Sequence, residues 1–324
     1  GADLPPFALD RPEDFFRILE VRGPGSKVVV GRDTERDGRL AAYGVVAYRP
    51  CYVNGALRAV PQFLEVFISP EYRNAGLFSR GCAFYQEHVL RGDDFAQSQV
   101  CVTNQLALKV FTSGRGGGPA FLPYGRHALI TLPLGDVPGM GRAGAAARRV
   151  ESRRAQPEDI PALDAFFKEW GPTKQFFPAY EFGALGTGYY LDLAIDDFFL
   201  GFRNGRLAGV VGVWDQGRFK STHTLDGAEG NAIRGGKPLF LHAMLMEEND
   251  PAVMAALVDC IRAAYAESPF GFLTLGLDAE DPLRYGLEHL PQGVVLTHHL
   301  LVTFGKDPRP GMRPGPFYLE SARC

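Results

Sequence analysis

The sequence lacks the marks of a membrane protein and of a nucleic-acid-binding protein. No apolar run approaches the roughly 20 residues of a membrane-spanning helix, and the N-terminus has neither the basic segment nor the apolar core of a secretion signal. The 34 basic and 37 acidic residues nearly cancel, and no basic stripe is interleaved with aromatic residues. We therefore expect a cytoplasmic protein that binds neither membranes nor nucleic acid.

Cysteine is scarce and scattered. The five cysteines are an odd number, stand far apart and include no C-x-x-C pair, which argues against both a zinc site and a disulfide framework. His298 and His299 are adjacent on an expected strand, so their side chains point to opposite faces and cannot share one metal ion. We expect reduced thiols and no metal.

The chain is long enough for two domains, and an internal repeat supports that division. Its 324 residues suit two domains of roughly 150 residues each. The segment GRLAAYGVVAYRP at residues 38–50 resembles GRLAGVVGVWDQG at residues 205–217, and each follows an apolar, strand-like run. Both predict a β-hairpin, and the same hairpin at matching places indicates two copies of one domain.

The remaining elements follow the same order in each copy. After the hairpin, the patterns predict strand, helix, strand, helix and strand. A stretch rich in Gly, Ala and Pro, with no apolar period, separates the copies. We therefore divide the chain into a first domain over 1–134, a linker over 135–149, a second domain over 150–305 and a Pro/Gly-rich tail over 306–324. The tail ends in FYLES, a run compatible with a sheet-edge strand.

A glycine turn stands where an expected strand of the first copy meets its main helix, in VFISPEYRNAGLFSRG at residues 66–81. The strand must stop pairing at Pro70, because proline has no backbone N–H to donate. The chain then turns through residues 73–76 into the helix. Such a turn directs free N–H groups and the positive end of the helix dipole at one point, which suits a pyrophosphate. A glycine turn beside a solvated arginine is the structural alternative.

This stretch resembles the acyl-CoA-binding motif of the GNAT superfamily of N-acetyltransferases, V-x-P-x-x-[RQ]-x-x-G-x-[GA]. The matching positions are held by Ile68, Pro70, Arg73 and Gly76. Phe78 departs from the pattern, because the family usually has Gly or Ala there. The pattern matches neither the dinucleotide-binding G-x-G-x-x-G nor the phosphate-binding G-x-x-x-x-G-K-[ST].

A second family feature follows on the next expected helix, in TNQLALKVF. It is an Asn, then a small residue, then an aromatic, and these are Asn104, Ala107 and Phe111. The two motifs stand in the family's order with a strand between them. The resemblance covers residues 27–134 well, and the second copy only in the order of its elements and in its opening, RRAQPEDIPAL.

The resemblance implies an α/β (α+β) fold of two tandem GNAT-like domains, each a mixed, mostly antiparallel twisted sheet flanked by helices. It implies acetyl-CoA, or another acyl-CoA, lying between two central parallel strands, with its pantetheine pairing to the strand that carries EVFIS. A backbone N–H near Phe67 or Ile68 would then hold the thioester oxygen. The residues implied to bind the cofactor are Phe67, Ile68, Arg73, Asn74, Ala75, Gly76, Leu77, Phe78, Ser79, Asn104 and Ala107.

The resemblance also implies direct attack of an amine on the thioester, which needs a base and an acid. Glu65, three residues before Ile68, stands where similar enzymes often carry an acidic residue and is the candidate base, with a surface or salt-bridged role as the alternative. The family's usual acid is a tyrosine at the position of Phe111. Tyr124 is therefore the substitute candidate, with packing as the alternative, and His127 is a further alternative that we expect to be structural.

The equivalent corner of the second copy carries acidic residues instead of a cradle. Glu247, Glu248 and Asp250 stand there, with no Arg and no Gly. Three carboxylates close to a pyrophosphate would repel it strongly at low effective dielectric. We infer that the second copy is degenerate, has lost cofactor binding and serves as a scaffold, a substrate wall or the surface of a homodimer.

The sequence thus predicts an acyl-CoA-dependent N-acetyltransferase that moves an acetyl group from acetyl-CoA to a primary amine of an unidentified small molecule or peptide. The alternative is a GNAT-derived protein that binds a CoA ester or another metabolite with little or no turnover, which the departures at Phe78 and Phe111 favour. A third reading keeps the enzyme class but changes the donor to a longer acyl-CoA or an aminoacyl-tRNA. The lack of a basic surface counts against tRNA.

Overall fold

The computed structural model describes residues 7–10, 15–90, 92, 95–113, 118–135, 140–141, 143–219, 221–224 and 237–323; residues 136–139 and 142 of the expected linker lie outside the described residues. The α-helices of this part are α1 (Phe15–Arg22), α2 (Leu77–His88), α3 (Gln105–Thr112), α4 (Ile160–Trp170) and α5 (Pro251–Ala264). Its strands are β1 (Phe7–Asp10), β2 (Lys27–Asp33), β3 (Arg39–Val53), β4 (Ala56–Ile68), β5 (Ala96–Cys101), β6 (Ala120–Pro133), β7 (Glu151–Arg154), β8 (Phe198–Arg203), β9 (Arg206–Trp214), β10 (Ser221–Thr224), β11 (Lys237–Met246), β12 (Phe270–Asp278) and β13 (Gly293–Thr303).

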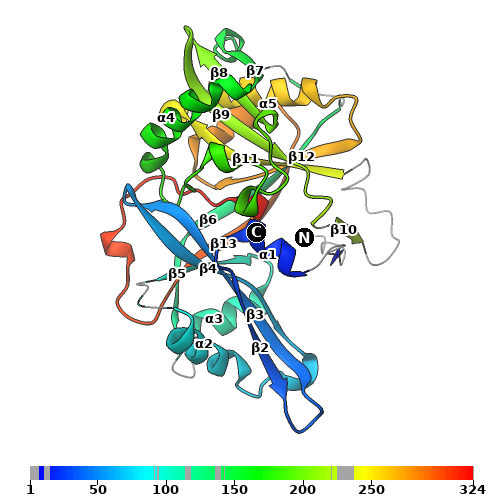
Figure 1. The fold of residues 1–324 in the computed structure, drawn as a ribbon, viewed down its shortest axis with the longest axis vertical. Coiled ribbons are helices and arrows are strands. Elements are labelled where there is room, and N and C mark those ends of the chain that lie inside the picture. Colours follow the sequence, from blue (N-terminus) through cyan, green and yellow to red (C-terminus); the bar gives the residue numbers. More distant parts are fainter. Residues whose placement is uncertain are drawn as a thin grey trace.

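Eleven of the described strands form one sheet, in the order β2-β3-β4-β5-β13-β6-β12-β11-β9-β8-β7, while β1 pairs with β10 separately. Neighbours in the large sheet are antiparallel except for two parallel pairs, β4 with β5 and β11 with β12. Helices α2 and α3 lie by the lower part of the sheet and α4 and α5 by the upper part (Figure 1). The expected mixed, mostly antiparallel sheet flanked by helices is confirmed.

The last strands of the two halves lie side by side at the centre of the sheet. β13, from the end of the chain, inserts between β5 and β6 of the first half, and β6 in turn pairs with β12 of the second half. Each half therefore completes the sheet of the other. The sequence predicted one sheet per copy and did not predict this joining, since strand exchange depends on pairing between distant segments. The division into two domains stays a prediction.

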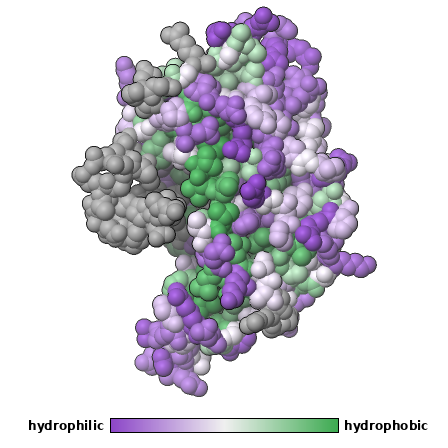
Figure 2. All heavy atoms as spheres, turned by 180° about the vertical axis from the view of Figure 1, so that it is seen from behind, coloured by the Kyte–Doolittle hydropathy of each residue, from purple (hydrophilic) through white to green (hydrophobic). Residues whose placement is uncertain are grey.

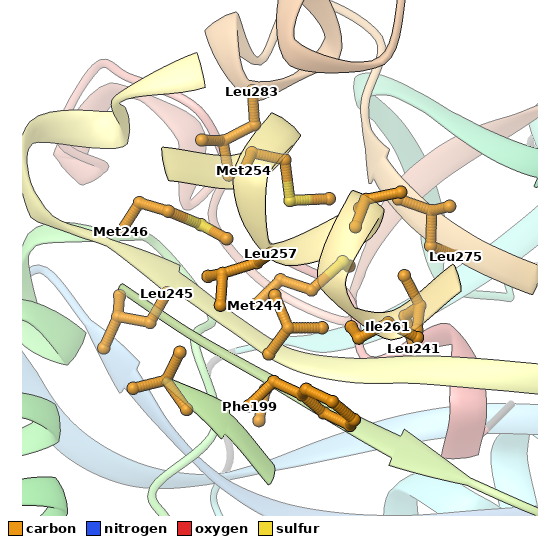
Figure 3. Close-up of a cluster of buried hydrophobic side chains, with 14 of the residues drawn as sticks. Phe199, Leu241, Met244, Leu245, Met246, Met254, Leu257, Ile261, Leu275 and Leu283 are labelled. Carbon is orange, nitrogen blue, oxygen red and sulfur yellow. The ribbon is translucent and has the colours of Figure 1, made fainter. Parts of the chain in front are cut away.

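Hydrophobic packing is deepest in the second half, where α5 covers the sheet. Figure 3 shows side chains of α5 meeting side chains of β8, β11 and β12. The labelled members are Phe199, Leu241, Met244, Leu245, Met246, Met254, Leu257, Ile261, Leu275 and Leu283, all fully buried or nearly so. In the first half a smaller buried cluster lies between the sheet and α2, including Val46, Phe63, Tyr85 and Val100. The buried cluster beside α2 is thus smaller than the one beside α5.

The tail of the chain is part of the interior. Residues 317–323 are all buried, although the sequence around them is rich in Pro and Gly. The sheet-edge strand that FYLES suggested does not form, because only Phe317 makes a single bridge, to Gln175. The next backbone N–H, of Tyr318, donates to the Gln175 carbonyl at 2.8 Å. None of the helices in the described part is long and apolar enough to cross a membrane.

Candidate functional site

Strands β4 and β5 diverge shortly after they pair. Their parallel ladder consists of Gln62 with Gln97 and Phe63 with Ser98, and beyond this point β4 has no ladder partner on the β5 side among the described residues. A β-bulge lies at this point, since Leu64 and Glu65 fit between ladder positions where β3 has a single residue. A bulge bends its strand, so β4 turns away from β5 and leaves an opening toward the carboxyl ends of both strands.

The turn from β4 into α2 has an open helix N-terminus. After a single 3-10 turn at Pro70–Tyr72, Asn74 and Gly76 adopt positive φ angles of 69° and 70°. Gly76 is the N-cap of α2, and no side chain caps this helix end. A Cβ added to Gly76 would meet nothing within 4 Å, so the space beside the first free N–H groups is open. The turn therefore fits the pyrophosphate of a CoA ester, since a helix N-terminus attracts an anion.

The charge around this turn is mainly positive. Arg73 is exposed, and its guanidinium has no ion-pair or hydrogen-bond partner among the described residues; Arg80 on the first turn of α2 is also exposed. The nearby carboxylate of Glu71 is compensated, because Arg36 and Arg39 bind it at 3.3 Å and 3.0 Å. An anion at the N-terminus of α2 would thus meet arginine charge with little opposing repulsion.

A pocket of about 350 Å³ lies between α2 and the sheet, against the opening. It is lined by residues 29–32 of β2, 41–44 of β3, Phe63 and residues 66–68 of β4, Ser98 of β5, one face of α2, Phe111 and Phe121. It brings together four residues that the sequence proposed for the cofactor, namely Phe67, Ile68, Leu77 and Phe78. Figure 2 shows hydrophobic side chains gathered in a band that runs down one face of the molecule. The pocket is thus an apolar site beside a positively charged helix end.

Comparison with known proteins identifies the fold. A scan against protein-family models and a search of curated proteins both find no match. A GCN5-related glucosamine N-acetyltransferase region in a fungal multi-domain GH3 β-N-acetylglucosaminidase superposes with a TM-score of 0.61 at 12% identity, covering 93% of this chain and 38% of that chain. N-myristoyltransferase of Saccharomyces cerevisiae, with bound myristoyl-CoA, superposes with a TM-score of 0.58 at 12% identity, covering 91% of this chain and 70% of that chain. This chain has the GNAT fold. It spans well under half of the length of the fungal protein.

In this GNAT fold the Asn of the second motif has a capping function. The Asn104 carboxamide oxygen accepts a hydrogen bond from the Ala107 backbone N–H at 3.1 Å and so caps α3. Ala107 packs against the buried cluster of the first half. Phe111, at the other end of α3, stacks on Phe78 with ring centroids 5.2 Å apart and on Phe121 at 4.5 Å. The two departures from the family pattern are therefore in contact with each other.

The candidate base lies beside the pocket but does not line it. Glu65 sits in the β4 bulge, next to Val66 of the pocket wall. Its carboxylate accepts a hydrogen bond from the guanidinium of Arg22 on α1, whose side chain is buried. Glu65 therefore forms the salt bridge that was the alternative to a catalytic role, and its partner is Arg22. The role of Glu65 as base stays a prediction.

The candidate acid lies in a different cluster. The Tyr124 ring packs edge-on against Phe176, Phe317 and His299, and Tyr124 is not part of the pocket lining. Burial raises the pKa of Tyr124 above its usual value. His127 is buried as well, which lowers its pKa to about 4 and keeps its imidazole neutral at pH 7. The structure does not bring these two side chains to the pocket.

The second half has an equivalent opening, which the chain's own tail fills. β11 pairs with β12 as far as Phe240 with Thr274 and then bulges at Ala243 and Met244. The N–H of Ala243 donates to Glu320 Oε2 at 3.0 Å, and the N–H of Met244 donates to the Tyr318 hydroxyl at 3.3 Å.

The same tail segment also reaches the other side of the opening. The Phe317 N–H donates to the Asp278 carboxylate, at the end of β12, at 3.2 Å. Residues 317–320 thereby bind both edges of the second opening and occupy the backbone N–H groups of Ala243 and Met244 that a pantetheine arm would need.

The N-terminus of α5, the helix that follows β11, is not available to bind an anion. Asp250 is the N-cap of α5, and its carboxylate accepts a hydrogen bond from the Ala252 N–H at 2.8 Å. The same carboxylate forms an ion pair with Arg203 at 2.5 Å. Gly76 is the equivalent N-cap residue of α2 and has no side chain that could cap the helix. The contrast supports the expectation that only the first half keeps a phosphate cradle.

Sequence reasoning missed much of the pocket wall. On α2 the missed residues include Gly81, Cys82 and Tyr85, and the spacing of Leu77, Gly81 and Tyr85 along one helix face was a signal that could have found them. Burial raises the pKa of the Cys82 thiol to about 11, so this side chain is a neutral wall residue at pH 7. No such signal marks the pocket residues of β2 and β3 in the sequence, because these residues line a pocket only where α2 packs over the strands. Within the described residues, no group of three or more His, Cys, Asp or Glu could hold a metal ion.

Proposed function

We propose that the protein is an acyl-CoA-dependent N-acyltransferase whose first half binds the CoA ester. The observation that carries the proposal is the open, uncapped N-terminus of α2 at Gly76, directly beside the opening between β4 and β5. The comparison proteins support the class, since their descriptions name a glucosamine N-acetyltransferase region and an N-myristoyltransferase with bound myristoyl-CoA. Acetyl-CoA is the simplest donor and a small-molecule or peptide amine the acceptor.

The reaction assigns a role to each part of the site. The amine nitrogen forms a bond to the acyl carbon, the carbon–sulfur bond breaks, and the thioester oxygen is held by a backbone N–H near Phe67 or Ile68. Glu65 takes the proton of the amine. Tyr124 remains the proposed source of the proton for the thiolate, but its ring lies outside the pocket lining and packs among other aromatic rings, which is the competing explanation.

Release of the free CoA thiol, measured with a panel of primary amines, tests the activity. Arg73→Ala should weaken the affinity for acyl-CoA by about tenfold or more, because a hydrogen bond between charged groups is lost. Arg206→Ala, an exposed arginine of the second half, is the matched control and should have no effect. If no acyl-CoA binds, or if both substitutions act alike, the proposal is wrong.

A second candidate function follows from the contact between Phe78 and Phe111. A phenyl ring stands at each of the two positions where the family has a small residue and a tyrosine, and a site altered in this way suits a protein that binds a CoA ester without turnover. Binding of acyl-CoA combined with no thiol release for any amine would favour this candidate. Thiol release that depends on Glu65 would reject it.

A further inference from the structure

We propose that the pocket beneath α2 holds the hydrocarbon chain of a fatty acyl-CoA, so that the donor is longer than acetyl-CoA. This inference names the donor of the proposed reaction and rests on that function. It uses the part of the pocket that the cradle and the thioester do not need: the walls from β2 and β3 and the inner face of α2.

The size of the pocket is the first argument. It measures about 350 Å³. A water molecule takes up about 30 Å³ in the liquid, so the two carbons of an acetyl group would fill only a small part of this space. Pockets that bind small molecules begin at about 300 Å³. The whole pocket, which also receives the thioester end of the cofactor beside Phe67 and Ile68, therefore has room for an acyl group several carbons longer than acetyl.

The chemistry of the walls is the second argument. The inner wall consists of Val29, Ala41, Gly44, Gly81 and Tyr85 together with other small or apolar residues. The charged lining residues, Arg32 and Arg80, are exposed and so belong to the rim. A sugar or a peptide in such a pocket would find few partners for its polar groups beyond the Tyr85 hydroxyl and Ser98, whereas an alkyl chain has no polar groups to satisfy.

The position of the pocket is the third argument. Phe67 and Ile68, which flank the expected thioester, line the same pocket as Gly81 and Tyr85 from the inner part of α2. A chain that leaves the thioester can therefore continue beneath the helix. Large apolar side chains line the pocket although they are well exposed, with Val66 at 46% and Phe84 at 45%. Exposed apolar groups gathered at a cavity are typical of a ligand-binding site.

Gly81 offers a sharp test, because it lines the pocket and a Cβ there would meet nothing within 4 Å. Gly81→Leu fills the space without straining the fold, since leucine is a better helix former than glycine. Ala83→Leu is the matched control on the exposed side of the same helix, outside the pocket lining. Calorimetric titration with CoA and with acetyl-, butyryl-, hexanoyl-, octanoyl- and decanoyl-CoA measures the dependence on chain length.

For the wild type we expect affinity to rise about fourfold per added methylene and then to level off when the pocket is full. Gly81→Leu should lose this dependence and keep its affinity for CoA, while Ala83→Leu should behave as the wild type. Equal binding of all esters by the wild type, with CoA still bound, would overturn the long-chain donor and leave the proposed function standing. Failure of CoA itself to bind would overturn both.

Discussion

Phe78 on α2 stacks on Phe111 of α3, with ring centroids 5.2 Å apart and ring planes 23° apart. These are the two positions at which the sequence departs from the GNAT motifs. Phe121 of β6 extends the stack, at 4.5 Å from Phe111. The two departures therefore form one packing unit, and the ring of Phe78 is also part of the pocket wall. We interpret the stack as a wall that shapes the site rather than as a block to CoA.

This interpretation predicts the behaviour of Phe78→Ala. Removal of a stacked ring should lower the melting temperature, because large-to-small changes lose packing and leave a cavity. The affinity for CoA, measured by calorimetry, should change by no more than about threefold, since the cradle itself is made by the backbone at Gly76. A gain of about tenfold or more would mean that the ring obstructs the cofactor and would contradict this interpretation of the stack.

Gly76→Val tests the cradle directly. We expect it to abolish CoA binding, because the valine side chain would enter the open space beside the helix N-terminus. Gly205→Val is its matched control: Gly205 also has a positive φ, 75°, and no neighbour within 4 Å, but lies in the β8–β9 turn. Each change should cost about 1–3 kcal/mol of stability through backbone strain. If both variants melt alike and both bind CoA, the cradle assignment fails.

Glu65→Gln removes the candidate base but keeps a hydrogen-bond acceptor for Arg22. The carboxamide oxygen can still accept the hydrogen bond from Arg22, but the negative charge beside this buried guanidinium is lost, so the melting temperature should fall while the affinity for acyl-CoA stays close to that of the wild type. Loss of the base should lower kcat by about 10² or more. An unchanged kcat would restrict Glu65 to a structural role. Tyr124→Phe, assayed in the same way, should lower kcat at unchanged stability if the hydroxyl supplies the proton.

Glu320 gives a prediction about pH. Its carboxyl group is buried and accepts hydrogen bonds from Ala243, Tyr180 and Tyr318, and burial raises its pKa. The carboxyl group of Glu320 therefore takes up its proton at a higher pH in the folded protein than in the unfolded chain. Protonation of this group as the pH falls raises the free energy of unfolding.

Urea unfolding of the wild type and Glu320→Gln between pH 8 and pH 5 measures the effect. Because the replacement is neutral at all these values, the wild type should gain stability relative to the variant as the pH falls. The gain can be at most about 1.4 kcal/mol per pH unit. A difference that stays constant, or that moves the other way, would show that Glu320 is not a proton-binding residue of the folded core.

The sequence predicted most of the local structure, because the signals were local. The hairpins, the strand before Pro70 and the helix after Gly76 lie where the patterns of apolar residues and breakers indicated. The turn at Gly76 was predictable for the same reason. The central pairing of β6 with β13 was not, since it joins the last strand of the first half to the last strand of the second half, far apart in the sequence.

Other features could not be read from the sequence because they depend on packing between distant segments. A tail rich in Pro and Gly gives no sign that Tyr318 and Glu320 bind the bulge of β11. In the sequence, residues 29–32 and 41–44 look like parts of ordinary half-buried strands. They become walls of a pocket only because α2 packs over them.

The stoichiometry of CoA binding tests the central claim most directly. The cradle at Gly76 is open, while the equivalent opening of the second half is filled by residues 317–320 and its helix is capped by Asp250. Calorimetric titration of the whole chain with CoA should therefore show one saturable site per chain, lost in Gly76→Val. Two sites per chain, or no binding at all, would contradict this account.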